Sequence, residues 1–377
     1  MKRIGYALAA PVIAALVAIV VSSVVLLISG HSPVTAFQTM WEYVDSADSV
    51  VNIINRAVPY YVAGVAVAIG FKMNLFNIGT DGQYRLAALF AAAAGAAVTL
   101  PAPIHVGFTL LVAMAVGGAY AAIAGILKVT RGVNEVVSTI MLNFIATGIS
   151  AFLLIEYFRD TSQNLTTQTK PLPSSGQLPA LNRLLEVFGY HLSSGTVLQG
   201  FLPFAIVIGV LYYVVVWRTR FGFELRATGL NPRAASASGV NAKAMILKAI
   251  VLSGVVAGLI GMGPLLADAG LHNYGDTFPT AIGFTGISIA LLGRNSPVGI
   301  ALAALVWATL ERAGQSLSPV GIPQEIVQIL AGTLLLSAVI AFEVVGRLAR
   351  ASAVREAAAR VAPPQPQPLE PAAVVGT

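Results

Sequence analysis

The sequence predicts an all-α membrane protein whose helices cross a lipid bilayer about ten times. Of its 377 residues, 56% are hydrophobic and only 10% are charged, whereas a soluble domain carries about 25% charged residues. The mean hydropathy is +0.81. The apolar residues form continuous runs of about 20 residues, which is the length that a helix needs to span a bilayer. In lipid, the backbone N–H and C=O groups must form their hydrogen bonds within the protein, which only helices and closed barrels allow. The runs do not alternate between apolar and polar residues, so we expect helices rather than a barrel.

We expect nine or ten spans, since the run at 280–293 is short enough to be a half-helix or a re-entrant piece. The first run follows Lys2 and Arg3, is too long for a signal peptide and lacks a clear cleavage site, so we expect an uncleaved span. Residues 1–345 then form one transmembrane domain, and the Pro-rich tail 346–377 is expected to be cytoplasmic and largely disordered. The predicted spans are residues 6–29, 50–70, 79–100, 104–127, 134–157, 198–217, 244–265, 280–293, 298–315 and 322–345.

The distribution of charge predicts that both termini lie in the cytoplasm. The loop at 218–243 carries five Lys or Arg residues and one Glu, and the tail carries further Arg residues. The loops at 30–49 and 266–279 carry Asp or Glu and no Lys or Arg. Cytoplasmic loops of membrane proteins are enriched in Lys and Arg. With ten spans, all the basic segments fall on the side of the N-terminus.

Several classes of function are excluded by composition and motifs. There is no cysteine, and the four His residues show no ligand spacing, so we expect no disulfide and no metal site. We find no phosphate-binding Walker A pattern, nucleophile elbow or zinc-protease motif. We therefore expect no catalytic residues and no enzyme activity in this chain. The net charge of +6 follows from the basic loops, so nucleic acid is not an expected partner.

Residues 71–90 concentrate polar groups inside an apolar region, and two interpretations are open. In the first, Thr80 caps a helix and Gln83 reaches back to complete a capping box. In the second, Asn77 and Asp81, four residues apart, share a helix face, and a broken helix presents its free N–H groups to a polar solute. An acid at membrane depth is a functional hypothesis by default. The two interpretations are compatible, because a cap at Thr80 would start a new helix and so create the break in the chain.

A second polar stripe lies on the predicted span at 134–157, where Glu135, Thr139 and Asn143 recur every four residues. Such a stripe either lines a cavity or joins two helices. Elsewhere, small residues recur four apart, as at Gly254 and Gly258, which is typical of close helix packing in membranes.

The basic loop at 220–245 predicts a short helix. Pro232 suits a first helical position and Gly239 a helix stop. The loop is either an ordinary charged connection or a docking element for another protein.

Four segments in order resemble the transmembrane permease subunits of bacterial ABC importers of the ribose and branched-chain amino acid class. They are similar above all to the nucleoside-type permeases, which work with basic membrane lipoproteins as binding proteins. The segments are FNIGTDGQ (76–83), GVNEVVSTIMLNFIA (132–146), RATGLNPRAASASGVN (226–241) and ISIALLGRNSPVGI (287–300).

The resemblance implies a permease subunit in the bacterial plasma membrane that forms the translocation pathway for nucleosides. It implies a second, often non-identical permease, an ABC ATPase and a lipoprotein solute-binding protein as partners. ATP and Mg²⁺ would bind the ATPase, and this chain would bind no cofactor. The loop would be the element that couples the pathway to the ATPase, through Thr228, Gly229, Leu230, Asn231, Pro232, Arg233, Ala234, Ala235 and Gly239.

The resemblance also directs attention to polar residues that face a solute. Hydroxyls and base edges of a nucleoside would meet the polar side chains, and a phenylalanine would stack on its ring. The Thr80–Asp81 pair departs from the commoner Val–Glu of the family, which shortens the reach of the acid. The expected pathway residues are Asn77, Asp81, Gln83, Glu135, Asn143, Phe76 and Phe144.

Two alternatives of function stay open. A permease of the same class for a simple sugar such as ribose would use the same polar groups. An ion-coupled secondary transporter, working alone, would use Asp81 and Glu135 as ion carriers. A pure scaffold has no need of an acid and amides within its spans.

Overall fold

The protein forms a bundle of helices in a computed structural model that describes residues 2–162, 166–187, 189–190, 192–193, 195–268, 270, 272–323 and 325–361. Within that part of the chain, the β-type contacts are two isolated bridges, Arg159 with Thr169 and Gln168 with Gly275. The α-helices are α1 (Lys2–Ile28), α2 (Pro33–Val44), α3 (Ala47–Lys72), α4 (Thr80–Ala96), α5 (Ala102–Arg131), α6 (Glu135–Leu153), α7 (Asn182–Val187), α8 (Leu202–Tyr213), α9 (Arg220–Leu230), α10 (Pro232–Ala237), α11 (Ala242–Gly258), α12 (Met262–Ala267), α13 (Ile282–Leu292), α14 (Pro297–Gly314) and α15 (Glu325–Val361). Short π-helical turns at Leu154–Phe158 and Val214–Arg218 extend α6 and α8.

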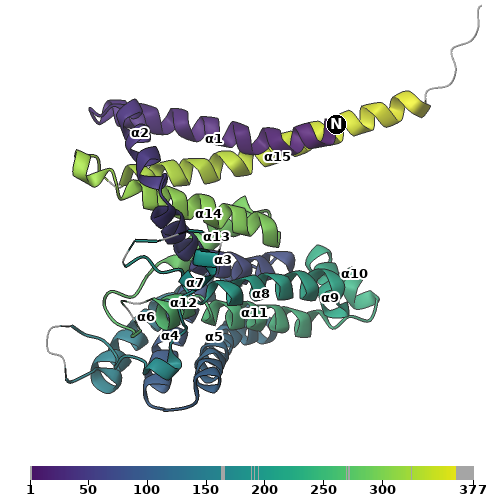
Figure 1. The fold of residues 1–377 in the computed structure, drawn as a ribbon. Helices are drawn as coiled ribbons and strands as arrows, with labels where there is room; N and C mark the ends of the chain where they lie inside the picture. The colour runs from purple at the N-terminus through teal and green to yellow at the C-terminus, as the bar shows by residue number, and fades with distance from the viewer. Residues whose placement is uncertain are drawn as a thin grey trace, which may run out of the picture.

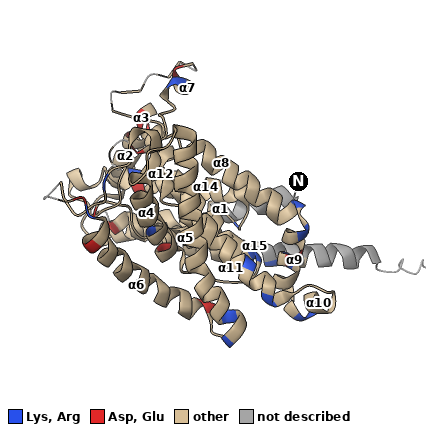
Figure 2. Ribbon diagram, turned by 90° about the horizontal axis from the view of Figure 1, so that it is seen from below, with Lys and Arg blue, Asp and Glu red and all other residues tan. Residues whose placement is uncertain are grey.

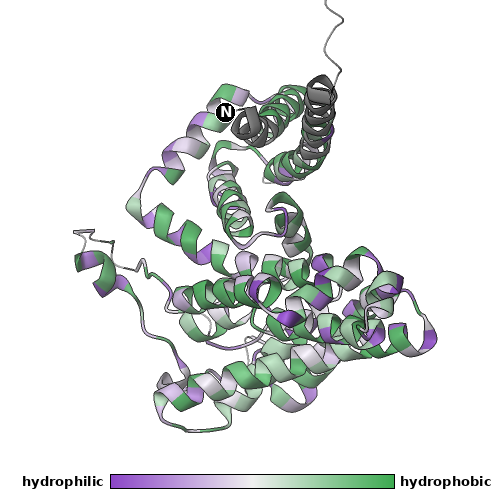
Figure 3. Ribbon diagram, turned by 90° about the vertical axis from the view of Figure 1, so that its right-hand side faces the viewer, coloured by the Kyte–Doolittle hydropathy of each residue, from purple (hydrophilic) through white to green (hydrophobic). Residues whose placement is uncertain are grey.

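The helical, membrane-type character of the chain is confirmed. Among the described residues, four helices are long and apolar enough to cross a membrane, and six are if each of two bent helix pairs counts as one span. Each predicted span overlaps helical structure, but the span at 244–265 is divided between α11 and α12. Helix α13 has only 11 residues, which is about 16 Å of helix and roughly half a bilayer. Hydrophobic residues run along the helices throughout the view in Figure 3.

Helix α3 is the centre of the bundle. Within its most apolar window, 78% of the residues are buried, and it packs against α8, α11, α13 and α14. Helix α6, by contrast, is only 28% buried over the same length, and its outward face is apolar. In a membrane protein such a face meets lipid or another subunit.

Helices α5 and α11 pack with their main chains in contact, as the spacing of Gly254 and Gly258 predicts. A β-carbon added to Gly258 would overlap the Ala113 carbonyl oxygen, and one added to Gly117 would overlap the Gly254 carbonyl oxygen. Gly117 and Gly258 also approach each other directly. Small residues are therefore obligatory along this contact.

Helices α1 and α15 lie antiparallel, side by side, along one edge of the molecule (Figure 1). Helix α1 begins, and α15 ends, at the end of the molecule where α9 and α10 lie. The described part of α15 extends to Val361, whereas the sequence predicts a largely disordered tail from residue 346. The remainder of that tail, 362–377, lies outside the described residues.

Two connections differ from expectation. The predicted acidic loop at 30–49 contains α2, whose N-terminus is capped by Ser32 and begins with Pro33. The basic loop contains a complete helix, α9, before the predicted short one. In both cases the helix follows a Ser or Thr cap, a start signal that the apolar pattern alone does not reveal.

The predicted capping box at the start of α4 is wrong. Gly79 occupies the cap position without a side-chain bond. The Thr80 hydroxyl donates instead to the Gly283 carbonyl at 3.2 Å, and the Gln83 amide bonds the side chain of Asn77. Because α4 begins only at Thr80, Asn77 lies in the preceding loop and does not share a helix face with Asp81. Tertiary partners have replaced the local cap.

Candidate functional site

The break between α3 and α4 is closed by Asn143, from the middle of α6. Its Oδ1 accepts a hydrogen bond from the Gly82 N–H at 2.8 Å, and its Nδ2 donates to the Ile78 carbonyl at 2.9 Å. The first N–H groups of any helix lack partners within the helix. Asn143 therefore satisfies one such group of α4 and one carbonyl of the loop before it.

A second set of bonds joins the same break to α3, α11 and α13. Ser253 of α11 accepts from the Asn77 amide at 2.9 Å and donates to the Ala66 carbonyl at 2.7 Å. Asp81 accepts from the Gly283 N–H of α13 at 3.3 Å. Each of these groups is buried, so the bonds form a polar cluster at the junction of five helices. Unpaired polar groups are costly in such a setting.

The structure thus brings together four of the seven predicted pathway residues, Asn77, Asp81, Gln83 and Asn143. The other three lie apart from them. Glu135, at the start of α6, pairs with Lys128 at 2.5 Å. The ring of Phe76 is half-exposed and meets Phe71 edge to face. Phe144 is 76% exposed on the outward face of α6. Contact of any of the seven with a solute stays a prediction.

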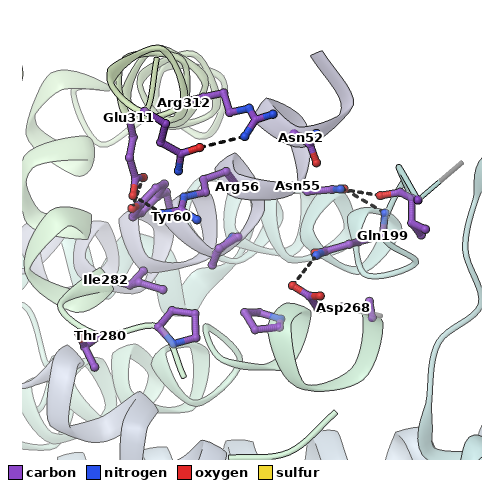
Figure 4. A pocket seen from close by; sticks show the side chains of 17 residues that line it. Asn52, Asn55, Arg56, Tyr60, Gln199, Asp268, Thr280, Ile282, Glu311 and Arg312 are labelled. Carbon is purple, nitrogen blue, oxygen red and sulfur yellow. Dashed lines mark hydrogen bonds and ion pairs between the residues drawn. The ribbon is translucent and has the colours of Figure 1, made fainter. Parts of the chain in front are cut away.

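A polar cavity that the sequence reasoning missed lies at the opposite end of α3. Its volume is about 360 Å³, within the range of small-molecule sites. We call it the α3–α14 cavity, and Figure 4 shows the side chains that line it. They come from α3, the segment before α8, the end of α12, the start of α13 and the end of α14: Asn52, Asn55, Arg56, Pro59, Tyr60, Gly195, Val197, Gln199, Pro264, Ala267, Asp268, Pro279, Thr280, Ile282, Glu311, Arg312 and Gln315.

An ion pair and a phenol hold one wall of this cavity together. The Glu311 carboxylate of α14 accepts from the Arg56 guanidinium of α3 and, at 2.6 Å, from the Tyr60 hydroxyl. Asn55 fixes another wall, since its side chain donates to the Val197 carbonyl and accepts from the Gln199 N–H. These bonds make the cavity a preformed space between elements that are distant in sequence.

A signal for the cavity is present in the sequence. Asn52, Arg56 and Tyr60 recur four residues apart and therefore share one face of α3. A charged residue inside a predicted span is a functional hypothesis by default. Arg56 lies within the predicted span at 50–70, and the groups that complete the cavity lie far from it in the sequence.

The third feature is the exposed end formed by α9 and α10, where Lys and Arg residues gather (Figure 2). Asn231 caps α10 by accepting from the N–H groups of Arg233 and Ala234, at 3.0 and 3.1 Å. Pro232 occupies the first turn, and Gly239 ends the element with a φ of 86°. The predicted short helix is thus confirmed in its start, length and stop.

The predicted coupling residues divide between two surfaces. Thr228 and Ala235 are buried, and Gly229 lies against the backbone of Lys72 and Met73 at the end of α3. The others face outward, and the Leu230 side chain is 89% exposed. One side of this element therefore packs on α3, and the other is free to meet a partner. The outward residues are Leu230, Asn231, Pro232, Arg233, Ala234 and Gly239.

The comparison with known proteins points to one family. Residues 49–339 match the family described as the branched-chain amino acid transport system permease component. The chain is 31% identical over 343 residues to the guanosine ABC transporter permease protein NupP of Bacillus subtilis, covering 89% of this chain and 94% of that protein. It is 28% identical over 351 residues to the nucleoside ABC transporter permease protein NupB of Lactococcus lactis, covering 92% and 94%. It is 32% identical over 328 residues to the glucose ABC transporter permease protein TsgB13 of Haloferax volcanii, covering 86% and 85%.

Proposed function

We propose that this chain, which belongs to the branched-chain amino acid transport system permease family, is the membrane-spanning permease subunit of an ATP-driven nucleoside importer. The observation that carries the proposal is α10, a short capped helix that packs on α9 and α11 and presents an open face at one end of the bundle. Relatives that are named as guanosine and nucleoside permeases match over almost their full length. The solute class is taken from them.

The topology that we propose has ten spans, with both termini and α10 in the cytoplasm of a bacterium and the chain in its plasma membrane. The basic residues around α10 support this orientation through the positive-inside tendency. The positions of the α1 start and the α15 end, on the same side as α10, support it too. The α3–α14 cavity then opens toward the outside.

The proposed partners follow from the same orientation. An ABC ATPase, which binds ATP and Mg²⁺, docks on the exposed face of α10. A second permease subunit completes the pathway, and a lipoprotein binding protein delivers the solute from outside. This chain itself carries no cofactor and catalyses no reaction. ATP-driven movement of the ATPase shifts α10, which contacts α9 and α11, and α9 passes the shift to the end of α3 through Gly229.

For the pathway, we propose that the buried cluster around Asn143 acts as its hinge. Asn77, Asp81, Gln83 and Asn143 hold the α3–α4 break in place and would meet solute only when their mutual bonds open. The edge of the pathway beside α6 is lined by the remaining three predicted residues, Glu135, Phe76 and Phe144.

A sugar permease is the second candidate, because the glucose permease TsgB13 is 32% identical over most of the chain. An ion-coupled transporter is the third, and the test separates all of them. The chain is reconstituted in liposomes with its ATPase, second permease and binding protein, and uptake of uridine, guanosine, ribose and glucose is measured with ATP. We expect ATP-dependent nucleoside uptake. Uptake by the chain alone, driven by a proton or sodium gradient, would overturn the proposal.

A further inference from the structure

We propose that the α3–α14 cavity is a binding subsite for an uncharged ring that bears several hydroxyls, the ribose of a nucleoside in the first instance. The inference rests on the proposed function for its solute and adds the place where that solute binds. Its residues are distinct from all those that the sequence predicted for the pathway.

The balance of charge in the cavity favours an uncharged solute. Arg56 and Arg312 contribute two positive charges, and Asp268 and Glu311 contribute two negative ones. Arg56 and Glu311 neutralise each other in an ion pair. A phosphorylated or carboxylated solute would enter without a surplus opposite charge to offset its desolvation. A neutral polar solute has no such cost.

Polar groups on two walls are available for hydrogen bonds. Among the described residues, neither the Asn52 amide nor the Thr280 hydroxyl has a hydrogen-bond partner. Asn52 is on α3, and Thr280 precedes α13, so the two come from different walls (Figure 4). An amide both donates and accepts, as does a hydroxyl. The pair suits a ligand whose own groups do both, as ring hydroxyls do.

A carboxylate completes this set. Asp268 accepts from the Gly270 N–H and, at a long 3.4 Å, from the Gln199 amide. A carboxylate has about four acceptor positions, so Asp268 retains capacity for two neighbouring hydroxyls. Hydrogen bonds to a charged acceptor are about twice as strong as neutral ones. Asp268 is therefore the group expected to discriminate for a diol.

The frame around these groups is already rigid, because the bonds from Glu311 to Arg56 and Tyr60 join α3 to α14. A preformed cavity lowers the ordering cost of binding. The free groups need only small side-chain movements to meet a ring.

The absence of cysteine from the chain makes a direct test simple. Val197→Cys and Pro279→Cys each place one thiol in the lining of the cavity without removing Asn52, Thr280 or Asp268, and Gln38→Cys places one on the exposed side of α2 as the control. Each variant is assembled with its partners in intact cells, and labelling by a membrane-impermeant maleimide is timed with uridine, ribose, glucose or uridine monophosphate present. ATP-dependent uptake is measured in parallel on the native chain.

We expect uridine, at about ten times its Kd, to slow labelling at positions 197 and 279 about tenfold and to leave position 38 unchanged. Protection by ribose as well supports recognition of the ring alone, and protection by glucose without uridine supports the subsite in a sugar permease. Equal protection by the monophosphate overturns the charge argument. No labelling in the cavity from outside, or no protection while nucleoside uptake is intact, overturns the subsite and leaves the proposed function standing. Absence of any uptake by the native assembly overturns both.

Discussion

The side-chain amides of Asn77 and Gln83 donate to each other, at 3.0 Å in both directions. Both side chains are almost completely buried. The pair bridges the loop before α4 to the first turn of that helix. The break between α3 and α4 is thereby a fixed structural element, held by these side chains in addition to the backbone bonds that Asn74 and Leu75 make to the end of α3.

Substituting Asn77→Ala is expected to destabilise the protein by about 1–3 kcal/mol, the cost of leaving a buried polar partner unpaired. The substitution removes the bonds to Gln83 and to Ser253 at once. The measurement is the midpoint of thermal unfolding of the purified chain in detergent. Ser253→Ala should lower the midpoint too, because it also breaks the Ala66 contact. An unchanged midpoint in Asn77→Ala would show that the pair does not hold the break.

Asn143→Ala is expected to reduce both thermal stability and solute uptake. The amide accepts a hydrogen bond from the Gly82 N–H and donates one to the Ile78 carbonyl. Its loss therefore leaves two buried backbone groups without a hydrogen-bond partner. The neighbouring Phe144→Ala is the control, since that ring is 76% exposed and its loss should leave the unfolding midpoint of the isolated chain nearly unchanged. Normal stability with lost uptake in Asn143→Ala would instead assign the amide to solute contact.

Leu230→Ala is expected to weaken ATPase binding about tenfold, which is the loss typical of an apolar anchor in an interface. The Leu230 side chain is 89% exposed, so the unfolding midpoint of the chain itself should not move. Co-purification of the ATPase and its affinity for the permease in detergent are the measurements. Phe223→Ala, at another exposed residue of α9, is the matched control. Retained ATPase affinity in the Leu230 variant would remove this residue from the docking face.

Glu311→Gln is expected to destabilise the bundle by about 1–3 kcal/mol, because the change removes the charge that Arg56 and Tyr60 share. The position of α14 relative to α3 depends on those bonds. Thermal unfolding again gives the readout. Glu325→Gln, at the exposed start of α15, is the control and should unfold like the native chain. If both variants unfold alike, the ion pair contributes nothing to the frame of the cavity.

Gly258→Ala is expected to be strongly destabilising, since the added methyl would overlap the Ala113 carbonyl oxygen of α5. Relief requires the two helices to separate, and overpacking of this kind costs about 1–3 kcal/mol or more. Gly148→Ala on α6 is the control, because nothing lies within 4 Å of its added methyl. That change should stabilise α6 by about 1 kcal/mol through helix propensity alone. Thermal unfolding of the two variants decides between these outcomes.

Features that depend on neighbours in sequence were predictable. Helix α10 follows from Asn231, Pro232 and Gly239, each of which acts within one helical turn. The long apolar helices, such as α3 and α5, follow from the length of the apolar runs, because the hydrophobic signal needs no partner. The close contact of α5 with α11 was visible in the spacing of Gly254 and Gly258.

Features that depend on tertiary partners were not. Thr80 and Gln83 have the pattern of a capping box, but Gly283 and Asn77 compete for their side chains. The α3–α14 cavity is assembled from five separate segments, so no single stretch of sequence describes it. The spacing of Asn52, Arg56 and Tyr60 along α3 is a local signal for one wall, but the remaining walls come from segments that are distant in sequence.

The intimate contact of Gly117 with Gly254 and Gly258 also determines how force travels. Two rods that touch main chain to main chain cannot slide past each other without steric overlap, so α5 and α11 have to turn together. Helix α11 begins at Ala242, shortly after α10 ends. A displacement of α10 therefore acts on α5 and α11 at one end of the two helices. If α5 and α11 rotate as one unit, the ends that lie farthest from α10 move the most. We expect the side of the bundle opposite the proposed ATPase site at α10 to undergo the larger displacement during each transport cycle.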